Sequence, residues 1–222
     1  ILIEPDMLHE IPGRFKALGF SKKVHLIGDN HTMAVAGQSL AEAILNAGMQ
    51  VSETVYRPIE GDLVPDEEAL NRLVEDVPAA VEVLIAVGSG TITDLVRYVA
   101  YKMEKPFVSV PTAPSMDGYA SAVAPLIVGG FKRTFPAHPP IAIYADLAIL
   151  CQAPLHMILA GFGDLIGKYT ARADWYLGRI LQDELVCQAS LDLMESALQQ
   201  CTADPEGLNQ RQPLLIQKLM EG

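Results

Sequence analysis

The chain has 222 residues, enough for one large or two modest domains with a substantial core. Half of the residues are apolar, which excludes a disordered chain, and a formal net charge of −11 argues against nucleic acid as a partner. With this charge, an anionic substrate needs a local site lined by basic groups or backbone amides. The three cysteines form no CxxC pair, so the sequence predicts reduced thiols in the cytoplasm rather than a structural zinc site.

Neither the start of the chain nor its most apolar stretch has the pattern of a targeting or membrane segment. The first ten residues, ILIEPDMLHE, contain acidic residues and no basic leader, so we do not expect a signal peptide. Residues 141–163 contain Asp146 and Pro154, which favours a core segment over a membrane span. Because the chain begins at Ile1 without a methionine, we expect that residues precede it or that its ends were trimmed.

Strand and helix patterns alternate through the first 150 residues, which predicts a parallel sheet with helices on its faces. Strands are expected at residues 24–27, 51–56, 83–87, 106–110 and 141–144, and a hairpin around Gly129-Gly130 at residues 122–135. Helices are expected at residues 30–47, from residue 65 onward and at 91–103. Gly48 is a natural left-handed terminator for the first of these helices.

After Cys151 the strand patterns stop and helical spacing takes over. Three helices are expected, at residues 154–169, 183–201 and 205–220, the last one interrupted by Gly207 and Pro213. We therefore predict the fold class α/β: a Rossmann-like parallel-sheet nucleotide domain at residues 1–150, followed by an incomplete all-helical domain at residues 151–222.

The segment from Val83 to Ser121 is the most informative part of the sequence. The apolar run VLIAV ends directly in Gly88-Ser89-Gly90-Thr91, and a helix pattern follows. Such a turn directs backbone N–H groups and the positive end of a helix dipole outward, which suits a phosphate or pyrophosphate. A tight turn without a ligand is about as frequent for this motif alone, and its spacing is not that of the usual GxGxxG.

The second buried strand, residues 106–110, opens into the polar loop PTAPSMDGYAS. Because ligands bind at the carboxyl ends of strands in open α/β sheets, we expect this loop beside the glycine turn. Its hydrogen-bonding side chains are those of Thr112, Ser115, Asp117 and Ser121. For Asp117, a local Asx turn is the simpler alternative.

Asp164 lies in AGFGDLIGK, within the most apolar helical pattern of the chain. A carboxylate there is costly unless it is paired or binds a metal, and the two glycines suggest that another segment approaches closely. An ordinary intrahelical salt bridge to Lys168 is the alternative. The five histidines are scattered without an HxxxH or HExxH pattern, so none of them is assigned to a metal.

GSGTITD (88–94), PTAPSMDGYAS (111–121), APL (153–155) and AGFGDLIGK (160–168) together resemble the glycerol-1-phosphate dehydrogenase family. This family belongs to the superfamily of dehydroquinate synthase, glycerol dehydrogenase and the iron-dependent alcohol dehydrogenases, and SMDGYAS points to the glycerol-1-phosphate branch. The resemblance runs through nearly the whole chain. It implies interconversion of dihydroxyacetone phosphate and sn-glycerol 1-phosphate with NAD(H) or NADP(H), assisted by zinc or nickel.

The resemblance also implies roles for particular residues. The pyrophosphate turn would comprise Gly88, Ser89, Gly90, Thr91 and Asp94; Thr112, Ser115 and Ser121 would contact the cofactor; Asp117 would contact the substrate; and Asp164 would bind both the metal and the substrate as the catalytic residue. Asp29 ends the first predicted strand, where a carboxylate can bind the adenosine ribose and favour NADH. A helix cap is the simpler explanation for Asp29.

The family completes its metal site with two histidines from a later helical stretch, which this chain lacks, and a catalytic metal needs about three protein ligands. We therefore expect an incomplete copy that is inactive alone. The expected partner is a small phosphorylated substrate, and we expect no membrane span in the chain. Whether the protein forms a homo-oligomer stays open. The alternatives are a glycerol or other alcohol dehydrogenase, or a nucleotide-binding module without catalysis.

Overall fold

The computed structural model describes residues 1–58 and 61–222 and contains two compact units. The first, here called the α/β unit, comprises Ile1–Thr112 and Gly118–Leu150. The second, the helical unit, comprises Ala113–Asp117 and Cys151–Gly222. The loop at residues 111–121 is therefore divided between the two units, a division that the sequence does not signal. That the units are a nucleotide domain and a metal and substrate domain stays a prediction.

The α/β unit is built on a six-stranded sheet in the order β1-β8-β5-β4-β2-β3, with each neighbouring pair parallel. The strands are β1 (Leu2–Glu4), β2 (Lys23–Asp29), β3 (Gln50–Tyr56), β4 (Val83–Val87), β5 (Phe107–Val110) and β8 (Ala142–Asp146). The predicted parallel sheet is thus confirmed. β1 was not predicted, because three partly exposed residues are too short to show a strand periodicity.

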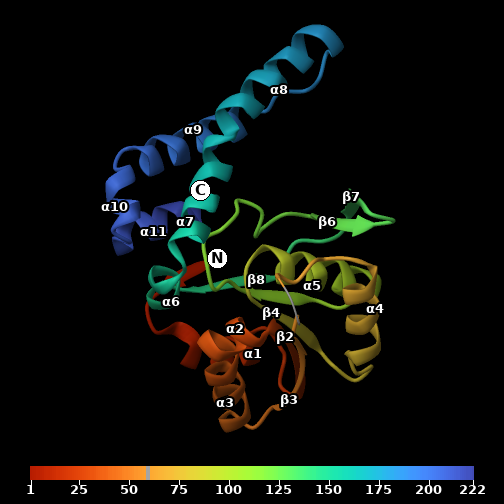
Figure 1. Cartoon of the computed structure of the whole chain (residues 1–222). Coiled ribbons are helices and arrows are strands. Elements are labelled where there is room, and N and C mark those ends of the chain that lie inside the picture. Colours follow the sequence, from red (N-terminus) through yellow and green to blue (C-terminus); the bar gives the residue numbers. More distant parts are fainter. Residues whose placement is uncertain (59–60) are drawn as a thin grey trace. The chain divides into compact units, whose positions relative to one another are not determined.

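Helices cover both faces of this sheet (Figure 1). On one face lie α1 (Ile11–Ala17), α2 (Asn30–Thr32), the π-helical turn η2 (Met33–Gly37) and α3 (Gln38–Asn46), preceded by the 3₁₀ turn η1 (Met7–His9). On the other face lie α4 (Glu67–Asp76) and α5 (Gly90–Lys102). All five residues of β4 are buried, as expected of a strand covered on both sides.

The helix predicted at residues 30–47 is interrupted by the π-helical turn η2. The side chain of Met33 fills the space beside Gly37, where a Cβ atom would lie 2.3 Å from the Met33 sulfur. The predicted terminator Gly48 has φ +83, a conformation that glycine adopts without strain.

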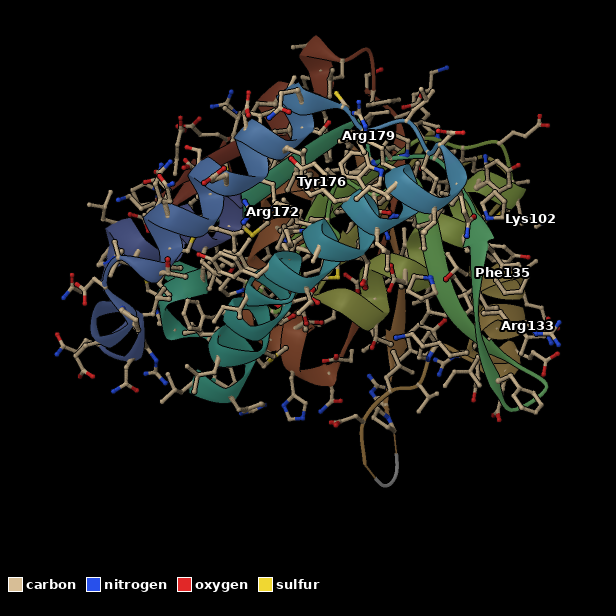
Figure 2. All side chains as sticks on the ribbon, turned by 90° about the horizontal axis from the view of Figure 1, so that it is seen from above. Lys102, Arg133, Phe135, Arg172, Tyr176 and Arg179 are labelled. Atoms are coloured by element: carbon tan, nitrogen blue, oxygen red, sulfur yellow. The ribbon has the colours of Figure 1, made fainter. Side chains whose placement is uncertain are left out.

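The predicted hairpin is confirmed as a separate two-stranded sheet of β6 (Val123–Val128) and β7 (Phe131–Pro136). Gly129 and Gly130 both have positive φ, at 61° and 77°, as a two-residue hairpin loop requires. Arg133 on β7 is exposed and points away from the ribbon in Figure 2.

The helical unit follows α6 (Leu147–Gln152), which crosses the boundary between the units. Its helices are α7 (Leu155–Ile166), α8 (Lys168–Gln182), α9 (Gln188–Thr202), α10 (Pro205–Asn209) and α11 (Pro213–Glu221). Where the sequence predicts three helices after residue 153, the described structure has these five. Gly167 separates α7 from α8, Asp183 ends α8 with φ +54, and Arg211 precedes α11 with φ +57.

The helix predicted near residues 183–201 is confirmed as α9, but it begins five residues later than predicted, because Asp183 adopts the left-handed conformation at the end of α8. Every residue of α8 is described, and none of them is buried; its side chains Arg172, Tyr176 and Arg179 are labelled in Figure 2. Within the described residues, no helix is both long and apolar enough to span a bilayer.

Candidate functional site

Three neighbouring strands of the α/β unit end at the same edge of the sheet. Ile27 on β2 pairs with Ala86 on β4, and Val87 on β4 pairs with Val110 on β5. The backbone N–H of Gly88 continues the ladder by donating to the carbonyl of Val110 at 3.1 Å. Asp29 at the end of β2, the glycine turn after β4 and the start of the loop after β5 therefore lie at one edge of the sheet, as the sequence predicts.

The glycine turn leads directly into the 13-residue helix α5. Gly88 is required there, because a Cβ atom would lie 2.9 Å from both the Cβ and the Cγ1 atoms of Ile92. Ser89 is the N-cap residue, Gly90 and Thr91 open the helix, and within the described structure no side chain caps this terminus and no acidic residue stands in its first turn. This helix end therefore leaves backbone N–H groups and the positive end of the helix dipole available to an anion.

Asp29 ends β2 and caps α2. Its Oδ1 atom accepts hydrogen bonds from the backbone N–H groups of His31 at 2.8 Å and Thr32 at 2.9 Å, and Thr32 Oγ1 accepts from the Asp29 N–H at 3.0 Å. The simpler explanation of Asp29, a helix cap, is thus confirmed. Its role toward the ribose stays a prediction.

Asp94 lies inside the α/β unit, with 8% of its surface exposed. Its Oδ1 atom accepts a hydrogen bond from Arg97 Nη1 at 2.5 Å. Burial raises the pKa of Asp94 to about 6, opposed by the positive charge of Arg97. The family resemblance places Asp94 in the pyrophosphate turn, but the structure commits this carboxylate to a buried ion pair. Sequence reasoning missed Arg97, although an acid and a base three residues apart in an apolar helix were a signal for such a pair.

The serine and threonine side chains of the second loop have different environments. Thr112 is buried at the end of β5, with 9% of its surface exposed. Ser121 forms a local turn in which its Oγ atom accepts from the N–H of Val123 at 3.1 Å. Ser115 is half-buried and belongs to the helical unit. The structure therefore brings Thr112 and Ser121 into the unit that carries the glycine turn, and places Ser115 in the other.

The helical unit contains a polar cluster formed by Asp117, Asp164 and Lys168. The backbone N–H of Asp117 donates to Asp164 Oδ2 at 3.0 Å, and Lys168 forms a short ion pair with the carboxylate of Asp117. The alternative prediction of an intrahelical Asp164–Lys168 bridge is wrong in its partner, since Lys168 binds Asp117. Asp164 is exposed, so the expected desolvation cost of a carboxylate among apolar residues does not arise.

Gly161 explains how this cluster is assembled. A Cβ atom at this position would lie 1.9 Å from the carbonyl oxygen of Pro114 and 3.2 Å from the carbonyl carbon of Ser115. Helix α7 and the segment Ala113–Asp117 thus pack backbone against backbone, which confirms the expected close approach at this glycine. Gly163 is different, since among the described atoms none lies within 4 Å of its Cβ position.

A metal centre cannot be completed from the residues that the structure describes. Among them there is no group of three or more histidine, cysteine, aspartate or glutamate side chains that could hold a metal ion. Asp117 and Asp164 are two carboxylates, and the ammonium group of Lys168 already neutralises one of them. A catalytic metal takes about three protein ligands, so this cluster alone does not fit one.

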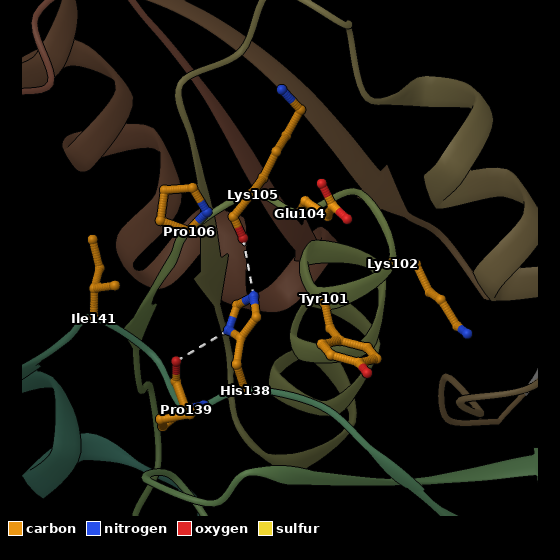
Figure 3. Close-up of a pocket in the computed structure, with 8 residues that line it drawn as sticks. All are labelled: Tyr101, Lys102, Glu104, Lys105, Pro106, His138, Pro139 and Ile141. Atoms are coloured by element: carbon orange, nitrogen blue, oxygen red, sulfur yellow. Dashed lines mark hydrogen bonds between the residues drawn. The ribbon is translucent and has the colours of Figure 1, made fainter.

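An open cavity of about 660 Å³ lies at the opposite edge of the sheet, beside the amino ends of β5 and β8 (Figure 3). The side chains of His138 and Lys105 in its lining are paired with backbone carbonyls: the two ring nitrogens of His138 lie 3.2 Å from the Pro139 carbonyl and 3.1 Å from the Lys105 carbonyl. Lys105 Nζ donates to the carbonyls of Ala79 and Val81. Because His138 and Lys105 are already paired, we take the carboxyl edge as the stronger candidate for a ligand.

Comparison with known proteins identifies relatives of this chain. The family described as iron-containing alcohol dehydrogenase matches residues 2–154. A glycerol-1-phosphate dehydrogenase [NAD(P)+] of Geobacillus stearothermophilus is 44% identical over 181 residues, which are 81% of this chain and 45% of the relative. The enzyme of the same name from Bacillus licheniformis is 42% identical over 212 residues, 96% of this chain and 53% of the relative. The chain thus spans about half the length of these relatives.

Solved structures show the same fold at low sequence identity. Glycerol dehydrogenase from Schizosaccharomyces pombe matches with a TM-score of 0.75 and 17% identity, covering 100% of this chain and 58% of that one. An iron-containing alcohol dehydrogenase from Thermotoga maritima matches with a TM-score of 0.77 and 13% identity, covering 99% of this chain and 65% of that one. At these identities the likeness establishes the fold alone.

Proposed function

We propose a function that starts from the family of this chain: it belongs to the iron-containing alcohol dehydrogenase family, as the match over residues 2–154 shows. The chain is proposed to form the nucleotide-binding part, and the beginning of the helical part, of an NAD(P)-dependent glycerol-1-phosphate dehydrogenase. The names of relatives at 42–44% identity support this substrate, and the chain's span of about half their length keeps it a proposal.

One observation carries the proposal: the uncapped amino end of α5 at the carboxyl edge of the sheet, entered through a glycine that no other residue can replace without moving Ile92. In open α/β sheets this is where a dinucleotide places its pyrophosphate. Because the chain carries a net charge of −11, backbone N–H groups are a more suitable phosphate site than most of its surface.

The proposed reaction transfers a hydride from the nicotinamide of NAD(P)H to the ketone carbon of dihydroxyacetone phosphate, and the alkoxide oxygen takes up a proton. The chain's own residues bind and orient the cofactor. Gly88–Thr91 would hold the pyrophosphate, Asp29 the adenosine ribose, and Thr112, Ser115 and Ser121 the remaining polar groups. Asp117 and Asp164 are proposed to contact the substrate.

A metal, zinc or nickel, is proposed for the whole protein, with Asp164 as one of its ligands; when bound, such an ion polarises the substrate carbonyl. The described residues do not complete its coordination, so turnover by this chain alone is not expected. A cytoplasmic location is proposed as well, which the three free cysteines support, together with a small phosphorylated substrate as the partner.

The experiment is a fluorescence titration of the chain with NADH. Gly90→Val places a branched side chain at the first residue of α5 and is expected to abolish binding while leaving the fold intact. Gly13→Val is the matched control, because Gly13 is an exposed helical glycine of the same unit with no described atom within 4 Å of its Cβ position. Equal affinity of the wild type and Gly90→Val would refute the placement. Binding without turnover in the whole protein would instead favour a nucleotide-binding module.

A further inference from the structure

Arg97 is a buried arginine on α5, with 1% of its surface exposed. Its guanidinium group donates four hydrogen bonds within the α/β unit. One goes to the carboxylate of Asp94 at 2.5 Å. The other three go to backbone carbonyls of one short segment: Gly118 at 2.7 Å, Tyr119 at 3.0 Å and Val123 at 3.1 Å. A single side chain thus ties the whole segment 118–123 to the helix that begins at the glycine turn.

Ser121 lies between the anchored residues of this segment and is hydrogen-bonded to two of them. Its backbone N–H donates to the carbonyl of Gly118 at 3.1 Å, and its Oγ atom accepts from the N–H of Val123 at 3.1 Å. Arg97 binds the carbonyls of the same two residues, Gly118 and Val123. The position of the Ser121 hydroxyl is therefore fixed through the guanidinium group.

The choice of an arginine follows from its geometry. A planar guanidinium presents several N–H donors in a rigid fork, so it can reach a carboxylate and three carbonyls at once. A lysine ammonium is a compact point charge on a flexible stem and cannot hold the same set of directions. Asp94 supplies the negative charge that a buried cation needs.

We propose that Arg97 is a positioning residue for the cofactor site: it fixes segment 118–123, and through it Ser121, while Asp94 acts on the cofactor only through Arg97 as its counter-ion. This inference rests on the proposed function for the role of Ser121. The anchoring of the segment is independent of any ligand, so the two can fail separately.

Hydrogen–deuterium exchange without ligand tests the anchoring. In Arg97→Lys, which keeps the positive charge beside Asp94, the amides of residues 118–123 are expected to exchange at least about tenfold faster, while those of β4 and α5 stay protected. Arg14→Met is the control, since Arg14 pairs with exposed Glu10 on the surface of α1. Unchanged exchange in segment 118–123 overturns the proposal. Global unfolding of Arg97→Lys overturns it as well, because the residue would then support the whole fold.

A double-mutant cycle on NADH affinity tests the coupling to Ser121. Arg97→Lys and Ser121→Ala are each expected to weaken NADH binding about tenfold, and the double variant to be no weaker than either one, because both changes remove the same contact. A purely structural Arg97 would give multiplying effects, which overturns the proposed coupling. If the wild type itself binds no NADH, the proposed function fails, and the exchange experiment still decides the anchoring.

Discussion

Gly161→Ala is the sharpest perturbation of the helical unit. The added Cβ atom would lie 1.9 Å from the carbonyl oxygen of Pro114, and the obstacle is backbone rather than a flexible side chain. Contacts of this kind are not seen below 3.0 Å, so the segment Ala113–Asp117 must retreat by about 1 Å or more. The same movement pulls the N–H of Asp117 away from Asp164 Oδ2, now at 3.0 Å.

The magnitude follows from two opposing effects. Overpacking typically costs about 1–3 kcal/mol, and a backbone obstacle at this distance belongs at the upper end. Alanine in place of glycine stabilises a helix interior by about 1 kcal/mol. The free energy of unfolding of the helical unit should therefore fall by about 2 kcal/mol.

Urea unfolding followed by tryptophan fluorescence measures this change, because the one tryptophan of the chain, Trp175, lies on α8 in the helical unit. Gly163→Ala is the matched control on the same helix: nothing described lies within 4 Å of its Cβ position, so it should stabilise by up to about 1 kcal/mol. If the two alanine variants shift the unfolding midpoint equally, the close backbone approach of Pro114 is not the reason why residue 161 must be a glycine.

Two further predictions concern the α/β unit. Burial lowers the pKa of His25 from 6.5 to about 4, so between these pH values the folded state binds fewer protons than the unfolded state. The free energy of unfolding therefore falls, by on the order of 2 kcal/mol, as the pH drops from about 6.5 to 4. His25→Gln should remove this part of the acid dependence, measured by urea unfolding followed by circular dichroism. Asp29→Asn keeps a good N-cap but removes the charge, so it should raise NADPH affinity relative to NADH, with unfolding free energy nearly unchanged. If Asp29→Asn leaves the ratio of the Kd values for NADPH and NADH unchanged, Asp29 acts only as the cap of α2.

The strands of the sheet interior could be predicted because burial on both faces leaves a continuous apolar run, as in β4. The hairpin was equally accessible, since Gly129 and Gly130 supply the positive φ angles of its loop. The edge strand β1 was not, because its register comes from pairing with β8, a contact across some 140 residues of sequence that no local pattern encodes. The end of α8 depends on the left-handed backbone of Asp183, which composition does not reveal.

The candidate site divides in the same way. The glycine turn and the polar loop follow from local sequence, because each directly continues a strand whose end the sheet order fixes. The partner of Lys168 does not: it binds Asp117 rather than Asp164, because the loop 111–121 folds back onto the helical unit, which is a tertiary property. The pair of Asp94 and Arg97 is different, since both residues lie on α5 three positions apart and their spacing was a local signal. Gly161 carried a usable signal, since a glycine inside an apolar helix suggests a close backbone approach.

The central claim is that a dinucleotide binds at the carboxyl edge of the sheet, and hydrogen–deuterium exchange of the chain with and without NADH tests it most directly. We predict slower exchange on NADH binding in residues 88–93 at the start of α5 and in residues 118–123, with no change at residues 101–106 and 138–141 beside the cavity of Figure 3. Protection confined to residues 101–106 and 138–141, or none at all under saturating NADH, would contradict the account.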